Sequence, residues 1–214
     1  MGIPFEQRNF QKELDKKIAG FQKDGIVPTL LLHSCCAPCS SHCIEYLSDY
    51  FHITVFYYNP NISAEEEYRK RVEEQKRFIS EFPAKYKVSF IEGDYDTKEF
   101  YDIAKGYEQC REGGERCFRC YELRLKKTCE TAKAGGFDYF TTTLTISPLK
   151  NSVRLNEIGL KLSEEYDMPY LLSDFKKKED ISVLLSFHMS IIYTGRIIAD
   201  VSIRVDFCTI SMIY

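Results

Sequence analysis

The chain has 214 residues, of which 44% are hydrophobic, and its formal net charge is −3. This length and apolar content suffice for one domain with a substantial core. Because the net charge is near neutral, the protein as a whole does not attract nucleic acid, and a contact with nucleic acid would need a local patch of basic residues. No charged segment followed by an apolar one opens the chain, and the apolar stretches near its end are too short and interrupted to span a bilayer. We therefore expect a cytoplasmic protein without membrane contacts.

Strand and helix patterns alternate along most of the chain. Helices are predicted over 11–23, 40–51, 63–82, 97–105, 119–134 and 151–166, and strands over 27–34, 52–62, 87–95, 137–145 and 168–175. Leu14, Ile18 and Phe21 form the apolar stripe of the first helix, and Ser63 with Glu66 predicts a capping box on the third. The alternation predicts an α/β fold, a parallel sheet with helices on both faces, whose ligands bind at the carboxyl ends of the strands.

Nine cysteines are distributed unevenly along the chain. Without an export signal we expect reduced thiols, not a disulfide scaffold. Cys208 stands alone, and the others form two groups: Cys35, Cys36, Cys39 and Cys43, then Cys110, Cys117, Cys120 and Cys129. Two groups in separate segments are typical of a metal site that folding closes.

The spacing within each group separates candidate ligands from core residues. Cys117 and Cys120 form a C-x-x-C pair that can reach one metal. The adjacent Cys35 and Cys36 can face one cofactor only where the chain turns, and the start of a helix supplies such a turn together with a dipole that favours thiolate. A structural zinc is one alternative, although a vicinal pair suits it poorly, whereas iron–sulfur clusters accept more varied spacings. Cys43 and Cys129 fit the core, and the roles of Cys39 and Cys110 stay open.

Polar residues near these thiols have weaker patterns. His33 and His42 could bind metal or move a proton, although a lone histidine is more often structural. Two loops follow predicted strands at the ligand-binding edge, and they contain Tyr57, Tyr58 and Asn59, and Ser147, Lys150 and Asn151. The first loop could stack on a base, and the second could bind phosphate or simply cap a helix. Glutamates lie between six basic residues, so the sequence equally favours phosphate binding and a mixed, solvent-exposed face. The basic residues are Arg111, Arg116, Arg119, Arg124, Lys126 and Lys127.

Four motifs in order make the chain resemble one family. They are LLHSCCAPCS, YYNPNI, EGGERCFRCYELRL and TTTLTISPLKN, and the likeness covers about residues 5–179. Together they resemble the QueH-type epoxyqueuosine reductases, bacterial cytoplasmic enzymes that reduce epoxyqueuosine to queuosine in tRNA. The resemblance implies an adenine-nucleotide hydrolase-like (HUP/Rossmann-like) fold.

The resemblance also implies the cofactor and its ligands. Cys35, Cys36, Cys117 and Cys120 would ligate a [4Fe–4S] cluster, and an additional iron is a further candidate. Tyr58, Asn59, Ser147, Lys150 and Asn151 are the candidate substrate-binding residues. Removal of the epoxide oxygen as water needs two electrons and two protons, so the partners would be the modified tRNA and an external electron donor.

The last part of the chain departs from this family. The family ends in a Tyr-Cys-Gly-Cys stretch with a redox-active cysteine pair, and this sequence has none. Its residues 197–201, IIADV, can be encoded as ATT ATT GCG GAT GTG, which contains TAT TGC GGA TGT, or Tyr-Cys-Gly-Cys, in another frame. Extending the exercise back to Asp180 gives YKRSIEFSHEYNLYRQDYCGC. We therefore predict a catalytic domain over 1–179, a frameshifted tail over 180–214, and reduced or lost activity.

Two other functions compete with this interpretation. An ATP-dependent tRNA-modifying enzyme of the same fold would need a glycine-rich loop after the first strand, where this chain has HSCCAPCSS. A zinc-stabilised tRNA-binding module would contain zinc in place of iron and sulfide.

Overall fold

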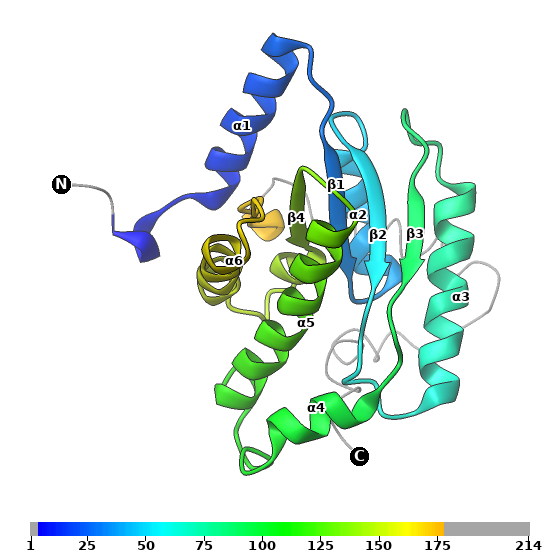
Figure 1. Cartoon of the computed structure of the whole chain (residues 1–214), viewed down its shortest axis with the longest axis vertical. Coiled ribbons are helices and arrows are strands. Elements are labelled where there is room, and N and C mark those ends of the chain that lie inside the picture. Colours follow the sequence, from blue (N-terminus) through cyan, green and yellow to red (C-terminus); the bar gives the residue numbers. More distant parts are fainter. Residues whose placement is uncertain (1–3, 178–214) are drawn as a thin grey trace.

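The computed structural model describes residues 4–177 as a set of alternating helices and strands (Figure 1). The helices are α1 (Phe10–Asp24), α2 (Ala37–Leu47), α3 (Glu65–Glu81), α4 (Thr97–Ala104), α5 (Glu115–Ala134) and α6 (Ser152–Tyr166). The strands are β1 (Thr29–Ser34), β2 (His52–Tyr57), β3 (Ser89–Glu92) and β4 (Tyr139–Thr142), with short 3-10 turns η1 (Phe5–Gln7), η2 (Thr143–Ile146) and η3 (Phe175–Lys177). The predicted boundary at 179 and the predicted tail lie outside the described residues.

The four strands form one parallel sheet in the order β3-β2-β1-β4. All four carboxyl ends therefore lie at the same edge, and the first residues of α5 lie toward that edge (Figure 1). This arrangement confirms the predicted α/β class.

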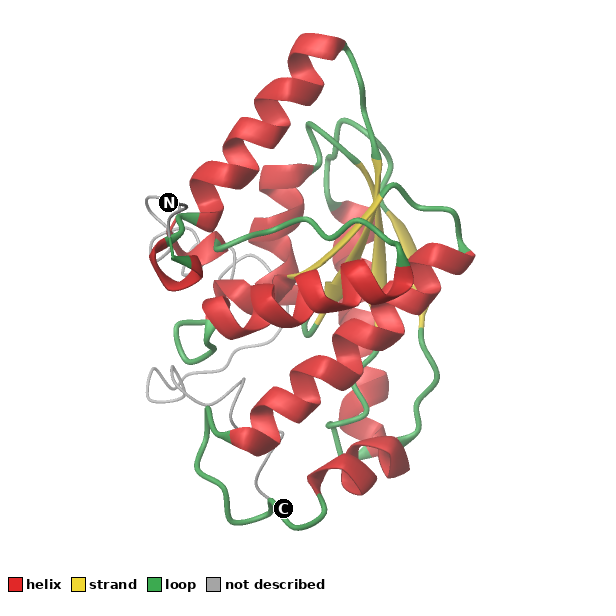
Figure 2. Cartoon of the chain, turned by 60° about the vertical axis from the view of Figure 1, so that its left-hand side comes forward, coloured by secondary structure: helices red, strands yellow, loops and turns green. Residues whose placement is uncertain are grey.

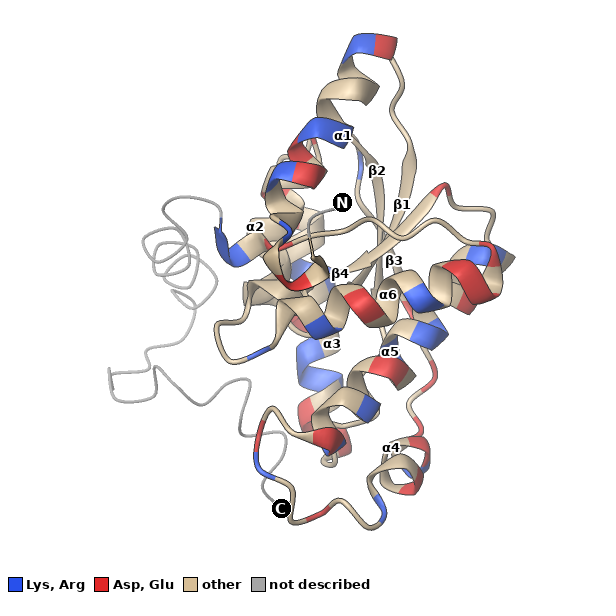
Figure 3. Cartoon of the chain, turned by 90° about the vertical axis from the view of Figure 1, so that its left-hand side faces the viewer, with Lys and Arg blue, Asp and Glu red and all other residues tan. Residues whose placement is uncertain are grey.

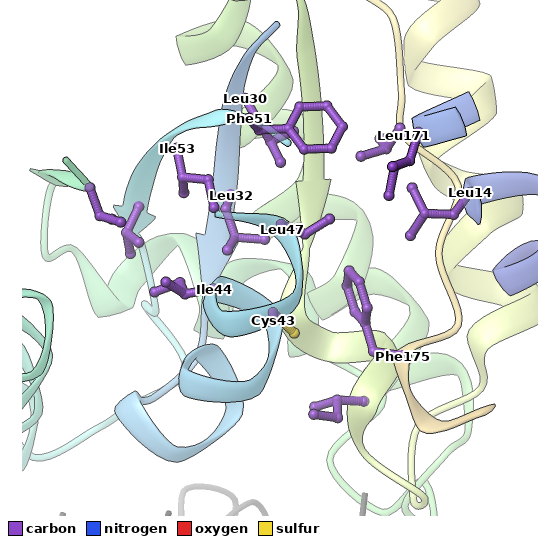
Figure 4. Packing of buried hydrophobic residues seen from close by; sticks show 14 of the residues in the cluster. Leu14, Leu30, Leu32, Cys43, Ile44, Leu47, Phe51, Ile53, Leu171 and Phe175 are labelled. Atoms are coloured by element: carbon purple, nitrogen blue, oxygen red, sulfur yellow. The ribbon is translucent and has the colours of Figure 1, made fainter. Parts of the chain in front are cut away.

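Alternate residues of β1 build a core on each face of the sheet. Leu30 and Leu32 pack with residues of α1, α2 and α3, including Leu14 and Ile18 (Figure 4). Leu31 faces the other way and packs with residues of α5 and α6. Both faces are therefore covered by helices (Figure 2), as a parallel sheet with buried strands requires. Within residues 4–177, no helix is both long and apolar enough to cross a membrane.

Two predicted helix starts differ from the structure. The predicted capping box is wrong, because Ala64 occupies the N-cap of α3 and no side chain caps this helix. Helix α5 begins at Glu115, four residues before the predicted start, after Gly113 takes a positive φ of 75° and Gly114 becomes the N-cap. Only glycine adopts such a φ freely, so this turn allows an early helix start. Cys117 and Cys120 consequently lie on the first turns of a helix.

The last predicted strand forms only an extended segment beside β4. Tyr170 makes a single parallel bridge with Phe140. The amide of Phe140 donates to the Pro169 carbonyl at 3.1 Å, and the amide of Leu171 donates to the Phe140 carbonyl at 2.9 Å. Since Pro169 has no N–H to donate, the ladder is short.

Candidate metal centre

The ends of three strands are joined around Cys35. Its amide donates to Thr143 Oγ1 at 3.4 Å, and the same hydroxyl lies 3.7 Å from Cys35 Sγ, which connects the ends of β1 and β4. Asn59, after β2, donates from Nδ2 to the Ser34 carbonyl at 2.9 Å. These bonds fix the carboxyl-end turn of β1, the position at which parallel sheets bind ligands.

Cys36 begins helix α2. It is the N-cap, with extended backbone angles φ −171° and ψ 161°, and Pro38 lies in the first turn. The sharp change from strand to helix lets both cysteines face one side, as the sequence predicted. The Cys35 and Cys36 Sγ atoms are 3.7 Å apart. Because a helix N-terminus carries partial positive charge, this position favours thiolate, the form that binds metal.

Cys39 belongs to the same thiol group. The sulfurs of Cys35, Cys36 and Cys39 all lie within 4.8 Å of one another, and this is the one such group found among the described residues. The sequence left the role of Cys39 open, although its place on the first turn of α2 could have indicated the proximity. Thiolates on one tetrahedral ion with metal–sulfur distances of about 2.3 Å lie about 3.8 Å apart. The three sulfurs could therefore hold a metal ion.

The hydroxyls of Ser34 and Ser40 and the side-chain amide of Gln75 form a buried network next to the vicinal cysteines. Ser34 Oγ and Ser40 Oγ both donate to Gln75 Oε1, at 2.8 and 2.7 Å. The carbonyl of Cys36 accepts a bond from the Ser40 amide at 3.1 Å and lies 3.0 Å from Ser40 Oγ. Helix α3, which carries Gln75, thus holds the turn in one conformation.

The second cysteine pair lies on the buried face of α5. Cys117 joins Cys35 in one apolar cluster, and Cys36 and Cys39 pack against its margin. The amide of Gly113 donates to Cys117 Sγ at 3.3 Å. Cys120 is equally buried but packs with Phe100 and Ala104 of α4. Cys35 and Cys117 therefore belong to one apolar cluster, Cys120 packs toward α4, and among the described residues neither cysteine of α5 joins the close group of Cys35, Cys36 and Cys39.

Two buried cations lie near the second pair. Burial raises the pKa of the Cys120 thiol, and the positive charges of Arg124 and Lys150 oppose that rise. Arg124 is 3% exposed and Lys150 is 6% exposed. A set of thiols in an apolar environment beside cations suits soft, thiolate-binding metals such as zinc or iron–sulfur clusters. The donor set therefore fits either centre.

For the basic set that includes Arg124, the sequence left phosphate binding and a mixed solvated face equally open, and the burial of Arg124 excludes the solvated alternative for this residue. The residue lies one turn after Cys120 on the same helix face. Arg124 also follows Cys117 by two helical turns, and this spacing could have predicted that its side chain is buried. Acidic and basic residues are mixed along the rest of α5 (Figure 3), and Arg119 pairs with Glu115 at 3.5 Å. That part of α5 is a mixed solvated face.

His33 is a structural residue of the strand end. It is fully buried, with Nδ1 2.9 Å from Thr142 Oγ1 and Nε2 3.1 Å from the Tyr58 carbonyl. Burial, together with the charge of Arg124, holds the pKa of this imidazole well below its usual range. Because Nε2 accepts from Arg124, Nδ1 carries the proton and donates to Thr142 Oγ1, and the neutral ring organises the strand ends.

The candidate substrate residues have different environments. The Tyr58 ring is buried and stacks on Phe56, and its hydroxyl donates to Glu99. Asn59 uses both ends of its amide inside the protein, accepting from Arg124. The loop after η2 is more open.

That second loop combines buried and exposed residues. Ser147 and Lys150 are buried at its two ends, whereas Leu149 between them is 46% exposed. Asn151 accepts from the Arg154 amide at 3.1 Å, so its predicted alternative role as a helix N-cap is confirmed.

The remaining cysteines separate as the sequence predicted. Cys43 and Cys129 are fully buried in the two cores, and burial raises the pKa of Cys43 well above its usual value and that of Cys129 to about 11. Both are small core residues. Cys110 is half-buried in the loop before α5, where its amide donates to the Tyr107 carbonyl.

Comparison with known proteins yields one consistent family. Residues 30–191 match the family model described as epoxyqueuosine reductase QueH. A protein of that name from Streptococcus pyogenes serotype M1 is 41% identical over 176 residues, covering 81% of this chain and 69% of the relative. The Staphylococcus aureus (strain Mu50) protein is 36% identical over 212 residues, covering 95% and 88%. The Thermotoga maritima protein is 34% identical over 155 residues, covering 70% and 76%.

Proposed function

Because the chain belongs to the epoxyqueuosine reductase QueH family, we propose that it is an oxidoreductase that reduces epoxyqueuosine to queuosine in tRNA. The epoxide oxygen leaves as water, the ring carbons become an alkene, and two electrons and two protons are consumed. The observation that carries this assignment is the family match together with a group of thiols at the ligand-binding edge of the sheet. A tRNA substrate implies the cytoplasm as its location.

We assign a [4Fe–4S] cluster to Cys35, Cys36, Cys117 and Cys120. Such a cluster, when bound, would relay electrons from an external donor, because no side chain of this protein is a two-electron donor by itself. Cys35, Cys36 and Cys117 share one apolar cluster, which supports this set. The proximity of Cys39 to the vicinal pair makes it the candidate ligand for an additional iron.

The protein side chains would do three things in this reaction. The Ser34, Ser40 and Gln75 network holds the vicinal cysteines in position. The apolar cluster on the α5 side excludes water from the thiols. Lys150, at the end of the open loop, is the candidate contact for an anionic part of the substrate, with Ser147 beside it.

A zinc-stabilised tRNA-binding module is the second candidate. The 3.7 Å separation of the Cys35 and Cys36 sulfurs supports it, because two thiolates on one tetrahedral ion lie at about this distance. Anaerobic purification followed by iron, sulfide and zinc analysis distinguishes the two. Iron together with sulfide supports the reductase, whereas one zinc without sulfide would support the module.

The proposed frameshift requires its own test, since residues 180–214 lie outside the described part of the chain. Two proteins are compared: this chain, and a variant in which the residues after Asp180 are YKRSIEFSHEYNLYRQDYCGC. We expect both to bind iron and sulfide, and the variant alone to reduce epoxyqueuosine at full rate in tRNA assayed by nucleoside mass spectrometry. Equal full activity in both proteins would contradict the frameshift. A gene read in one intact frame with other codons would do so independently.

A further inference from the structure

Arg124 is a buried cation that pairs with no carboxylate of the described residues. It is 3% exposed, and within residues 4–177 no carboxylate forms an ion pair with it. Arg71, which is also buried, pairs with Glu67 at 2.7 Å. A buried charge that lacks a counter-charge destabilises the fold, so such groups are normally paired or bound to something charged. Arg124 is therefore expected to have a partner of another kind.

The side chains that hold Arg124 are neutral. Its Nε donates to His33 Nε2 at 3.3 Å, and its terminal nitrogen donates to Asn59 Oδ1. Asn59 is in turn bonded to the Ser34 carbonyl, and His33 to Thr142. Neutral acceptors orient a guanidinium group but leave its charge uncompensated. The arrangement fixes the direction of the positive charge at the ends of β1 and β2.

The thiols of the two cysteine pairs are a source of negative charge on the elements that Arg124 joins. Arg124 lies one turn after Cys120 on the same buried face of α5. Its other neighbour, His33, lies two residues before Cys35 on the same strand end. Arg124 thus belongs to the helix that carries one cysteine pair, and it bonds a residue of the strand that leads to the other pair. Four thiolates outweigh the positive charge of an iron–sulfur core, so a cluster bound in this way is anionic.

We propose that Arg124 is a positioning residue that supplies the fixed counter-charge of the thiolate-bound cluster, oriented for that role by His33 and Asn59. This inference rests on the proposed function. The proposed role of Arg124 has two consequences, one for the reduction of the cluster and one for the stability of the cluster-free protein. The positive charge favours the more negative, reduced state of the cluster, and it destabilises the protein that lacks the cluster.

Three variants test this proposal. Arg124→Gln removes the charge and keeps an amide donor, Arg124→Lys keeps the charge, and Lys126→Gln removes an exposed charge from the same helix as the matched control. The cluster reduction potential is measured by spectroelectrochemical titration. The cluster-free proteins, prepared by chelation, are compared by thermal unfolding.

For Arg124→Gln we expect reduction to become about tenfold less favourable, equivalent to about 59 mV for one electron. Its cluster-free form should unfold at the same or a higher temperature than the cluster-free wild type. Arg124→Lys should retain most of the wild-type potential, and Lys126→Gln should match wild type in both measurements. A residue with only a structural role would give the opposite pattern, with lower stability of the cluster-free protein.

The outcomes separate the inference from the proposed function. Wild-type protein without iron and sulfide overturns both. Wild-type protein with a cluster whose potential is unchanged in Arg124→Gln overturns the inference alone. A clear loss of stability in cluster-free Arg124→Gln overturns it as well, because the buried charge would then be compensated within the protein.

Discussion

Gly159 of α6 marks the closest approach between a helix and the segment beside β4. A Cβ atom at this position would lie 2.4 Å from two carbons of the Tyr170 ring. Carbon atoms in contact lie about 3.5 to 4.0 Å apart, so the ring would have to move by about 1 Å or more. That ring is 5% exposed and packs on Phe140 with centroids 5.1 Å apart. The ring therefore has little room to move.

We expect Gly159→Ala to destabilise the protein by about 1–2 kcal/mol. Overpacking a core costs about 1–3 kcal/mol, and the better helix propensity of alanine returns about 0.5–1 kcal/mol. For a chain of this length the loss corresponds to a melting temperature lower by about 2–8 °C. Urea and thermal unfolding measure both quantities.

Gly20 of α1 provides the matched control. It is exposed, and a Cβ there would meet nothing within 4 Å, so Gly20→Ala should stabilise by about 0.5–1 kcal/mol. The double variant Gly159→Ala with Tyr170→Leu should lose less stability than the sum of the two single variants, because the smaller side chain relieves the contact. A Gly159→Ala protein as stable as the wild type would refute the packing described for this segment.

Further predictions concern the thiols and their support. Cys117→Ser should lose most of the bound iron and sulfide, whereas Cys129→Ser should retain both; equal loss in the two variants would contradict the ligand assignment. Because burial raises the pKa of Cys129 to about 11 from 9.0, the unfolded chain releases this proton first as the pH rises. The stability that it contributes is therefore present below pH 9 and lost toward pH 11, so cluster-free Cys129→Ser should have a flatter stability profile in that window. Gln75→Leu should cost about 1–3 kcal/mol in chemical unfolding, because the hydroxyls of Ser34 and Ser40 would both lose their buried acceptor; an unchanged midpoint would show that those hydroxyls bond elsewhere.

Local patterns were sufficient for the order of elements and for the separation of the cysteines. The alternation of apolar strands with amphipathic helices predicted a parallel sheet, since consecutive parallel strands require a crossover between them. Cys43 and Cys129 were recognised as core residues from their helical positions. The vicinal pair was placed at a helix start, and it lies there, because the strand before it and Pro38 after it are both local features.

Local patterns were not sufficient for the exact ends of the elements. The third helix lacks its predicted cap, and the last predicted strand makes a single bridge, beside which Pro169 has no N–H to donate. The early start of α5 depends on the positive φ of Gly113, which the residue pattern does not specify.

The sequence by itself determined which residues can do the chemistry: the clustered thiols lie close along the chain and need no fold to be recognised. Only the tertiary structure decided how they are surrounded. Helix α5 packs on β1 so that Arg124 reaches His33, and the side chain of this cation is buried, whereas the sequence left open whether it is solvated or binds phosphate. Burial and electrostatic pairing depend on which elements meet in space, and these depend on the fold as a whole.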